Sequence, residues 1–185
     1  MRFIEAIERY SPAGEQERQD ARMMRRYAEI FPDVLSRTNE TAHFTASAWI
    51  VSPDRSRVLM IYHNIYNSWS WTGGHADGQD DPLAVAIKEA REETGLAHIR
   101  PAGEELLLLE ILTVKAHVKR GKYVVPHLHL NLTYLLEADD ADAIHIKPDE
   151  NSGVKWFAPE DALSACTEPE MLPIYRKLIE RSAKL

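Results

Sequence analysis

The chain has 185 residues, of which 44% are hydrophobic and 28% are charged, and its formal net charge is -7. This length fits one globular domain with a sizeable core, and the negative charge argues against a surface for nucleic-acid duplexes, which needs clustered Lys and Arg. The single cysteine, Cys166, excludes an internal disulfide and is compatible with a reducing compartment. Because no apolar run approaches the ~20 residues of a membrane span and the first ten residues lack the core of a signal peptide, we expect a cytoplasmic protein.

The N-terminal segment has the character of a helical extension. Residues 15–35 are charged and helix-prone, and Pro32 is expected to end or kink the helix. The apolar positions expected on its inward face are Met23, Tyr27 and Ile30 or Phe31. We expect this segment to pack against a sheet, with a lid or a dimer contact as the alternative. The predicted division is residues 1–40 as an N-terminal helical extension and 41–185 as the main domain.

The rest of the chain alternates β-forming runs with turn signals. Strands are predicted at residues 43–51, 57–62, 105–119, 127–137 and 153–157, with a break at 120–122. Helices are predicted before Gly95, at 160–165 and at 170–184. Mixed strands with a few helices favour the α+β class, arranged as an α/β/α sandwich around a mixed sheet.

Residues 74–96, GHADGQDDPLAVAIKEAREETGL, form the most informative pattern. A helix would place Glu89, Glu92 and Glu93 on one face, because these residues are three and four positions apart. The start and stop signals are Asp81 as N-cap, Pro82 at the first helical position and Gly95 at the end. Like charges held together repel each other unless something offsets them, and a hard divalent cation is the simplest candidate. Mg²⁺ prefers oxygen ligands and typically brings phosphate oxygens with it.

This stretch resembles the signature of the Nudix hydrolases, G-x5-E-x7-R-E-U-x-E-E-x-G-U, in which U is a bulky apolar residue. The matching positions are Gly74, Glu89, Glu92, Glu93, Gly95 and Leu96. The departures are Asp80 for the first glutamate, Lys88 for the arginine and Ala90 for a larger aliphatic residue. None of the departures removes a glutamate from the helix face.

The resemblance implies a Nudix-like α/β/α sandwich and a hydrolase that uses Mg²⁺ or Mn²⁺. Its expected reaction is cleavage of a diphosphate linkage in a nucleoside diphosphate linked to another moiety. It also implies Glu89, Glu92 and Glu93 as metal ligands, with one of them or a glutamate from elsewhere activating water. Glu150 is the best-placed acid outside the motif, with an exposed loop acid as the alternative. The catalytic candidates are therefore Glu92, Glu93 and Glu150.

A second pattern lies in the predicted strand 127–137. His127, His129 and Asn131 alternate with leucines, so they share one face of the strand. We predict that His127 and His129 contact the substrate, together with Gly74 and His75 at the start of the motif. Solvent-facing polar residues and a second metal site are the alternatives, and His117 could join from a neighbouring strand. A cluster of aromatic residues before the motif, from Tyr62 to Trp71, is expected to serve mainly in core packing.

Two other functions share this scaffold. Isopentenyl-diphosphate isomerase needs a catalytic cysteine in the early strands, whereas the only cysteine here is late in the chain. A non-hydrolytic nucleotide-binding module is the remaining alternative, although such modules commonly lose glutamates that are all present here. The sequence does not identify the substrate, because residues 111–114 carry neither the proline nor the tyrosine of common substrate-specific subgroups. It also leaves a homodimer open.

Overall fold

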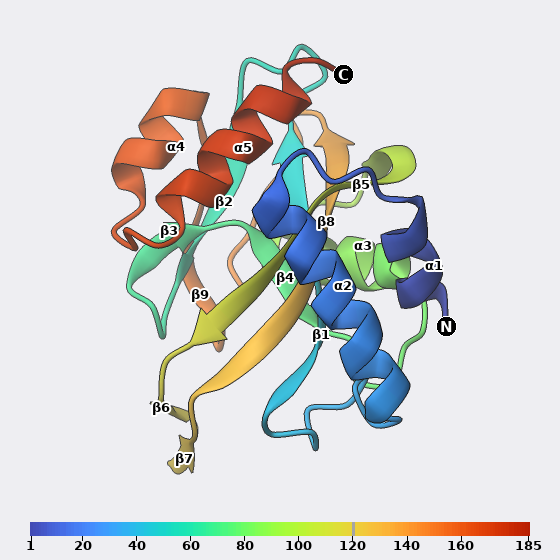
Figure 1. The fold of residues 1–185 in the computed structure, drawn as a ribbon. Helices are drawn as coiled ribbons and strands as arrows, with labels where there is room; N and C mark the ends of the chain where they lie inside the picture. The colour runs from blue at the N-terminus through green and yellow to red at the C-terminus, as the bar shows by residue number, and fades with distance from the viewer. Residues whose placement is uncertain (120) are drawn as a thin grey trace.

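The computed structural model describes residues 1–119 and 121–185, so the predicted break at 120–122 lies partly outside the described residues. The helices are α1 (Arg2–Arg9), α2 (Glu15–Ile30), α3 (Pro82–Thr94), α4 (Pro159–Ala165) and α5 (Leu172–Ser182) (Figure 1). The strands are β1 (Ala42–Val51), β2 (Val58–His63), β3 (Ser68–Ser70), β4 (Thr72–His75), β5 (Ile99–Val114), β6 (His117–Lys119), β7 (Lys122–Val124), β8 (His127–Ala138) and β9 (Asn151–Phe157). None of the helices in the described part of the chain is long and apolar enough to cross a membrane.

The main sheet has seven strands. Its central path is β3-β2-β1-β8-β5, while β4 pairs with β1 and β9 pairs with β2. Strands β1 and β8 run parallel, whereas β1 is antiparallel to β2 and β4, and β5 is antiparallel to β8. The sheet is therefore mixed, as predicted, and β6 and β7 form a separate two-stranded sheet.

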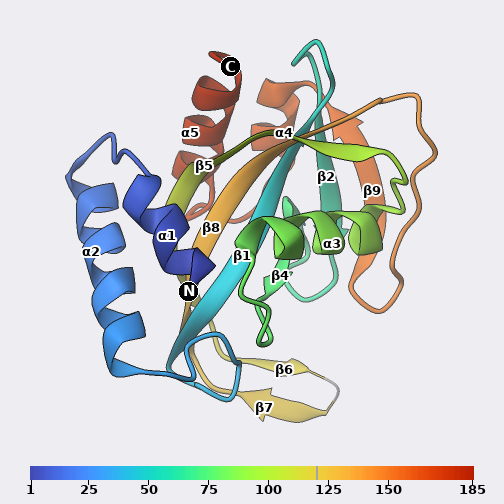
Figure 2. The ribbon, with the colours of Figure 1, turned by 90° about the vertical axis from the view of Figure 1, so that its right-hand side faces the viewer.

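Side-chain alternation along β1 separates two cores. Phe44 and Ile50 pack in a cluster with residues of α1, α2 and α3, while Trp49 and Val51 pack in a cluster with residues of α4 and α5, including Tyr175. Figure 2 shows α3 in front of the sheet and α4 and α5 behind it. Helices on both faces of a mixed sheet make the predicted α/β/α sandwich.

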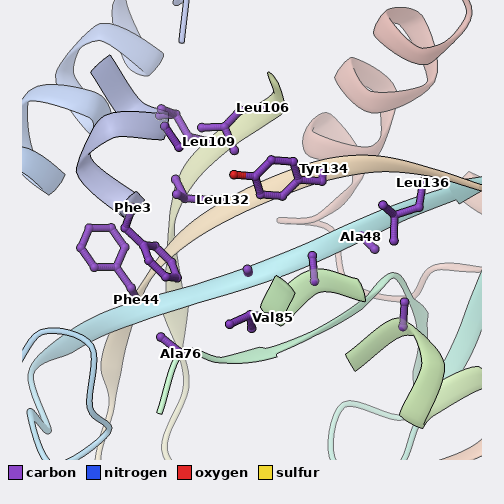
Figure 3. Packing of buried hydrophobic residues seen from close by; sticks show 14 of the residues in the cluster. Phe3, Phe44, Ala48, Ala76, Val85, Leu106, Leu109, Leu132, Tyr134 and Leu136 are labelled. Carbon is purple, nitrogen blue, oxygen red and sulfur yellow. The ribbon is translucent and has the colours of Figure 1, made fainter. Parts of the chain in front are cut away.

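The N-terminal helices α1 and α2 pack in the core that contains Phe44 and Ile50. Phe3 of α1 contacts Phe44 of β1, with 5.0 Å between ring centroids, next to Leu109 and Leu132 (Figure 3). Burial of side chains of this size stabilises a fold by about 1.5–3 kcal/mol each. The N-terminal segment thus packs against the sheet, while the boundary at residue 40 stays a prediction.

The inward face of α2 differs in part from the prediction. The buried residues are Glu17, Ala21 and Met24, and the predicted Tyr27 is half-buried against the core that contains Phe44, whereas Met23, Ile30 and Phe31 are exposed. The helix ends at Ile30, two residues before Pro32, in agreement with the expected end of the helix at this proline. The cause of the different inward face is a charged contact, because buried Glu17 accepts hydrogen bonds from Tyr10 Oη (2.7 Å) and from Arg181 Nη2 (2.6 Å). This contact turns the neighbouring side of the helix inward. Helix α1 was not predicted.

Candidate active site

Helix α3 carries the acidic face and begins and ends at the predicted residues. The side chain of Asp81 accepts a 3.1 Å hydrogen bond from the backbone N–H of Ala84, and Pro82 opens the helix. Gly95 ends it with φ of 72°, in the left-handed region that favours glycine. These local signals fix the helical register and so place the three carboxylates on one face.

The three carboxylates differ in exposure. The side chain of Glu92 is 41% exposed and that of Glu89 is 13% exposed, while Glu93 is 3% exposed. Glu93 Oε2 accepts a 2.9 Å hydrogen bond from the backbone N–H of Gly73 in β4. Burial, with repulsion from Glu89 and Glu150, raises the pKa of Glu93 well above the usual carboxyl value. Burial and the neighbouring acids therefore favour the protonated form of Glu93 unless a cation offsets its negative charge.

Two lysines bridge the acidic groups. Lys88 Nζ lies 2.9 Å from Glu89 Oε1 and 3.2 Å from Glu92 Oε1. Lys147 Nζ lies 3.1 Å from Glu92 Oε2 and 3.0 Å from Glu150 Oε2. Burial opposes the charged form of Lys147, but Glu150 and Glu92 raise its pKa. The same lysine lowers the pKa of Glu92.

These contacts surround a cavity of about 880 Å³. Its lining includes Glu89, Glu92, Glu93, Glu150 and Lys147. Glu150 is therefore close to the acidic helix, and its role as a further acid of the site stays a prediction. The predicted substrate-binding residues Gly74, His75, His127 and His129 also line the cavity.

The donor set fits a hard divalent cation. Glu89, Glu92, Glu93 and Glu150 offer carboxylate oxygens, which Mg²⁺ and Mn²⁺ prefer. Two ammonium groups already lie between these carboxylates, and the pKa of Glu93 is raised partly by its acidic neighbours. The cluster therefore has excess negative charge that a bound cation would offset.

The motif departure at Asp80 has a structural explanation. Asp80 Oδ1 accepts a 3.0 Å hydrogen bond from the backbone N–H of Arg2, and Asp81 Oδ2 lies 2.7 Å from Arg2 Nη1. Asp80 is not among the described residues that line the cavity. This position connects the N-terminal helix α1 to the start of α3 instead of joining the acidic group.

The histidines of β8 face the cavity, as strand alternation predicted. His127 Nε2 lies 3.2 Å from His129 Nε2, and Asn131 accepts hydrogen bonds from Thr45 and Ser47 through Oδ1. Burial, with the nearby imidazoles of His75, His43, His127 and His117, lowers the pKa of His129 to about 2. The ring of His129 is therefore neutral at physiological pH.

The aromatic cluster before the motif divides between two roles. Trp69 packs edge-on against Phe157 and Tyr62 in the second core region, as expected for packing. His63 and Tyr66 stack on each other at 4.4 Å between centroids and line the cavity. Cys166 is buried and is not among the described residues lining the cavity, which argues against a role for it in catalysis there.

Several cavity residues were not predicted as site residues, among them His43, Arg37 and Lys147. His43 stands opposite His129 in the parallel pairing of β1 with β8. Arg37 donates to Asp77 through Nε at 2.8 Å, and Lys147 reaches the acids from the segment before β9. The sequence contains no local signal for these positions, because each depends on segments that are distant in the chain.

Comparison with known proteins gives a consistent result. A family model described as "NUDIX domain" matches residues 41–180. The chain is 41% identical over 54 residues to a CMP-5'-(N-acetyl-N-hydroxy-3-aminopropyl)phosphonate hydrolase of Streptomyces rubellomurinus, covering 27% of this chain and 26% of that protein. It is 25% identical over 111 residues to a probable DHNTP pyrophosphohydrolase of Lactococcus lactis subsp. cremoris, covering 60% of this chain and 63% of that protein. The matched segments thus span less than two thirds of either relative.

The fold is similar to solved structures as well. A crystal structure of a C. elegans Ap4A hydrolase binary complex superimposes with a TM-score of 0.57 at 22% identity. The superposition covers 77% of this chain and 98% of that chain. This likeness shows a shared fold.

Proposed function

This chain belongs to the NUDIX domain family, and we propose that it is a metal-dependent pyrophosphohydrolase. Its proposed substrate is a nucleoside diphosphate linked to another moiety, and the bond that breaks is in the diphosphate linkage. The observation that carries this proposal is the convergence of Glu89, Glu92, Glu93 and Glu150 on one cavity of about 880 Å³. Water attack would give two phosphorylated products, or a monophosphate and pyrophosphate from a nucleoside triphosphate.

Glu89, Glu92 and Glu93 are the proposed ligands of Mg²⁺ or Mn²⁺. A bound cation of this kind neutralises phosphate oxygens and lowers the pKa of water. Gly74 supports this role because its missing side chain leaves room for Glu89. A Cβ built on Gly74 would lie 2.5 Å from Glu89 Cδ. The Gly73 N–H holds Glu93 in a fixed orientation at the other end of the acidic face.

The remaining charged groups of the cavity suit an anionic substrate. Lys88, Lys147 and Arg37 line the cavity and can pair with phosphate oxygens once these replace their present carboxylate partners. Glu150 is the proposed group that orients or deprotonates the attacking water, with Glu92 and Glu93 as the other candidates. The ion pair between Glu150 and Lys147 keeps the positive charge of an ammonium group next to this carboxylate.

The substrate class rests on the cavity and the named relatives together. The cavity is large enough for a compound of nucleotide size, and the relatives are named for a CMP-linked phosphonate, DHNTP and Ap4A. We propose a small molecule of the nucleoside-diphosphate type as the substrate. A cytoplasmic location and a homodimer stay predictions.

A substrate panel tests the proposal. The full chain is incubated with Mg²⁺ and nucleotide sugars, ADP-ribose, a CMP-linked phosphonate, DHNTP, Ap4A and nucleoside triphosphates, and the products are identified by ³¹P NMR. We expect cleavage of at least one compound between phosphorus atoms, loss of turnover with a chelator, and its recovery when Mg²⁺ is returned. Glu104→Gln, an exposed change on β5, is the control for Glu93→Gln.

The alternative of a binding module has a distinct outcome. If panel compounds bind in calorimetry and every one of them is recovered uncleaved, a non-hydrolytic role is favoured. Turnover that persists in both Glu92→Gln and Glu93→Gln would contradict the assignment of the site, because each change removes a proposed oxygen ligand.

A further inference from the structure

A second group of ligand-type side chains lies in the same cavity, apart from the acidic helix. His43, His75 and His129 each offer one ring nitrogen, and these atoms lie within 4.8 Å of one another. The ring centroids are 5.0 Å apart for His43 and His75, 5.1 Å for His43 and His129, and 5.0 Å for His75 and His129. The three rings come from different strands and meet at one point.

The backbone fixes this meeting point. His43 and His129 are direct partners in the parallel pairing of β1 with β8. His75 is the partner of Thr45 in the antiparallel pairing of β1 with β4. Because all three strands belong to the main sheet, the positions of the imidazoles are set by ladder hydrogen bonds rather than by a loop. Rigid strands are suitable supports for a site that needs defined ligand positions.

His43 shows that this group is incomplete as it stands. Its Nδ1 lies 2.9 Å from the carbonyl oxygen of Asn39, which can only accept, so Nδ1 carries a proton. Its Nε2 is buried and has no hydrogen-bond partner among the described residues. The residue itself is only 3% exposed. A buried polar nitrogen without a partner is unfavourable in either protonation state, so a ligand at Nε2 would remove this cost.

The arrangement of His43 is typical of a metal-binding histidine. Such a residue donates its remote N–H to a carbonyl or carboxylate, which fixes the tautomer and directs the other nitrogen to the ion. The tautomer of His129 is fixed in a similar way, by its hydrogen bond to His127. His127 Nδ1 lies 2.9 Å from the carbonyl oxygen of Val125, so in the neutral pair His127 Nε2 accepts from His129 Nε2. This leaves Nδ1 of His129 as an electron-pair donor.

We propose that His43, His75 and His129 form a binding site for a divalent transition-metal ion of the Zn²⁺ class, separate from the carboxylate face of α3. Imidazole nitrogens suit Zn²⁺, Co²⁺ and Ni²⁺, whereas Mg²⁺ prefers oxygen ligands. A Zn–N bond is about 2.0–2.1 Å long. Nitrogens within 4.8 Å of one another can therefore reach one ion through small side-chain rotations.

The position of this site gives the ion access to cavity ligands. All three histidines line the 880 Å³ cavity that the acidic residues also line. Three protein ligands with an exchangeable fourth position are typical of zinc sites that bind small molecules. His75 directly follows Gly74, against which Glu89 packs. An ion at the histidines would therefore occupy the same cavity as the proposed substrate.

Metal binding to the untagged full chain tests the proposal. The protein is freed of metal by a chelator and titrated with Co²⁺, whose visible absorption reports nitrogen coordination, and then with Zn²⁺ in competition. With excess Mg²⁺ present to fill the carboxylate site, we expect one nitrogen-coordinated Co²⁺ per chain, which Zn²⁺ displaces and Mg²⁺ does not. His75→Gln and His129→Gln should each weaken Co²⁺ binding by about 100-fold, with folding checked by circular dichroism.

The controls separate this site from the proposed hydrolase site. His98→Gln removes a histidine whose side chain is 85% exposed and should leave Co²⁺ binding unchanged. Glu92→Gln should lose Mg²⁺-dependent turnover while it keeps Co²⁺ binding, so a failure of one proposal does not imply a failure of the other. Half-buried His75 gives a variant with less risk of misfolding than buried His43.

Three results would overturn the proposal. The first is a wild-type chain that leaves stoichiometric Co²⁺ and Zn²⁺ unbound. The second is wild-type affinity in folded His75→Gln and His129→Gln. The third is loss of Co²⁺ binding in Glu92→Gln with full binding in both histidine variants, which would place the ion on the carboxylates.

Discussion

The carboxyl group of Glu89 lies directly against the α-carbon of Gly74, so that a Cβ on Gly74 would come within 2.5 Å of Glu89 Cδ. Gly74→Ala should therefore displace Glu89 without unfolding the protein. We expect turnover to fall by about 100-fold, because a misplaced ligand of this kind loses the geometry that the reaction needs. Steady-state kinetics with Mg²⁺ on a cleaved panel substrate measure this change.

Gly103→Ala is the matched control for Gly74→Ala. A Cβ on Gly103 would meet nothing within 4 Å, and its backbone is outside the left-handed region. The Gly103→Ala variant should have the turnover and the melting temperature of the wild type. Equal turnover in the two variants would contradict the role of Gly74 as the space for Glu89.

Glu92→Gln and Glu93→Gln should keep the fold and lower turnover by several orders of magnitude. Each change removes an anionic oxygen ligand from the proposed cation, and Gln is close to Glu in shape. Single-turnover rates and circular dichroism distinguish lost chemistry from lost folding. Glu104→Gln supplies the exposed control, and near-wild-type rates in either α3 variant would refute the assignment.

Lys88→Arg should be tolerated. Lys88 Nζ contacts both Glu89 and Glu92, and a guanidinium keeps the charge and can hold two carboxylates through its planar fork. Lys88→Met should lower turnover by about tenfold, because the two carboxylates lose the group that orients them. The comparison of kcat for the two variants checks this. A collapse in Lys88→Arg would show a separate role for the lysine.

Lys147→Gln should lower the Mg²⁺ concentration needed for half-maximal activity. The ammonium group lies between Glu92 and Glu150 and repels an incoming cation, so its removal leaves a more negative site. The measurement is a Mg²⁺ titration of turnover, with the Mg²⁺-dependent rise in melting temperature as a second readout. A higher Mg²⁺ requirement would mean that Lys147 helps to assemble the ligands.

Glu17 should make stability depend on pH in the acid range. Burial opposes ionisation of Glu17, but hydrogen bonds from Ala13 and Tyr10 and the charge of Arg181 lower its pKa below 4.5. A carboxyl with a lowered pKa stabilises the fold above its unfolded pKa, and this contribution is lost as the pH falls through the folded pKa. Glu17→Gln should cost about 1–3 kcal/mol of the free energy of unfolding near neutral pH.

Urea unfolding of both proteins across the acid range checks this prediction. The difference in free energy of unfolding between wild type and Glu17→Gln should shrink below about pH 4, where Glu17 becomes protonated in the unfolded state and then in the folded state. Glu29→Gln, an exposed change on the same helix, should show no such difference. A constant difference at all pH values would contradict the ionic role.

The sequence by itself determined the acidic helix and most of the strands. The Asp81 cap, Pro82, the spacing of the glutamates and Gly95 act within a few residues of one another, so the helix and its charged face follow from local geometry. Strand alternation likewise placed His127, His129 and Asn131 on one side of β8. Local periodicity misjudged part of α2, whose buried face includes Glu17, bonded to Tyr10 just after α1 and to Arg181 of α5.

Only the tertiary structure decided which distant groups meet. The parallel pairing of β1 with β8 puts His43 opposite His129, and pairing with β4 adds His75. The path of the chain before β9 puts Lys147 between Glu92 and Glu150. A parallel pairing has no short turn to signal it in the sequence, and a long lysine side chain can reach many partners. These contacts therefore depend on the packing of the whole chain, which local patterns do not encode.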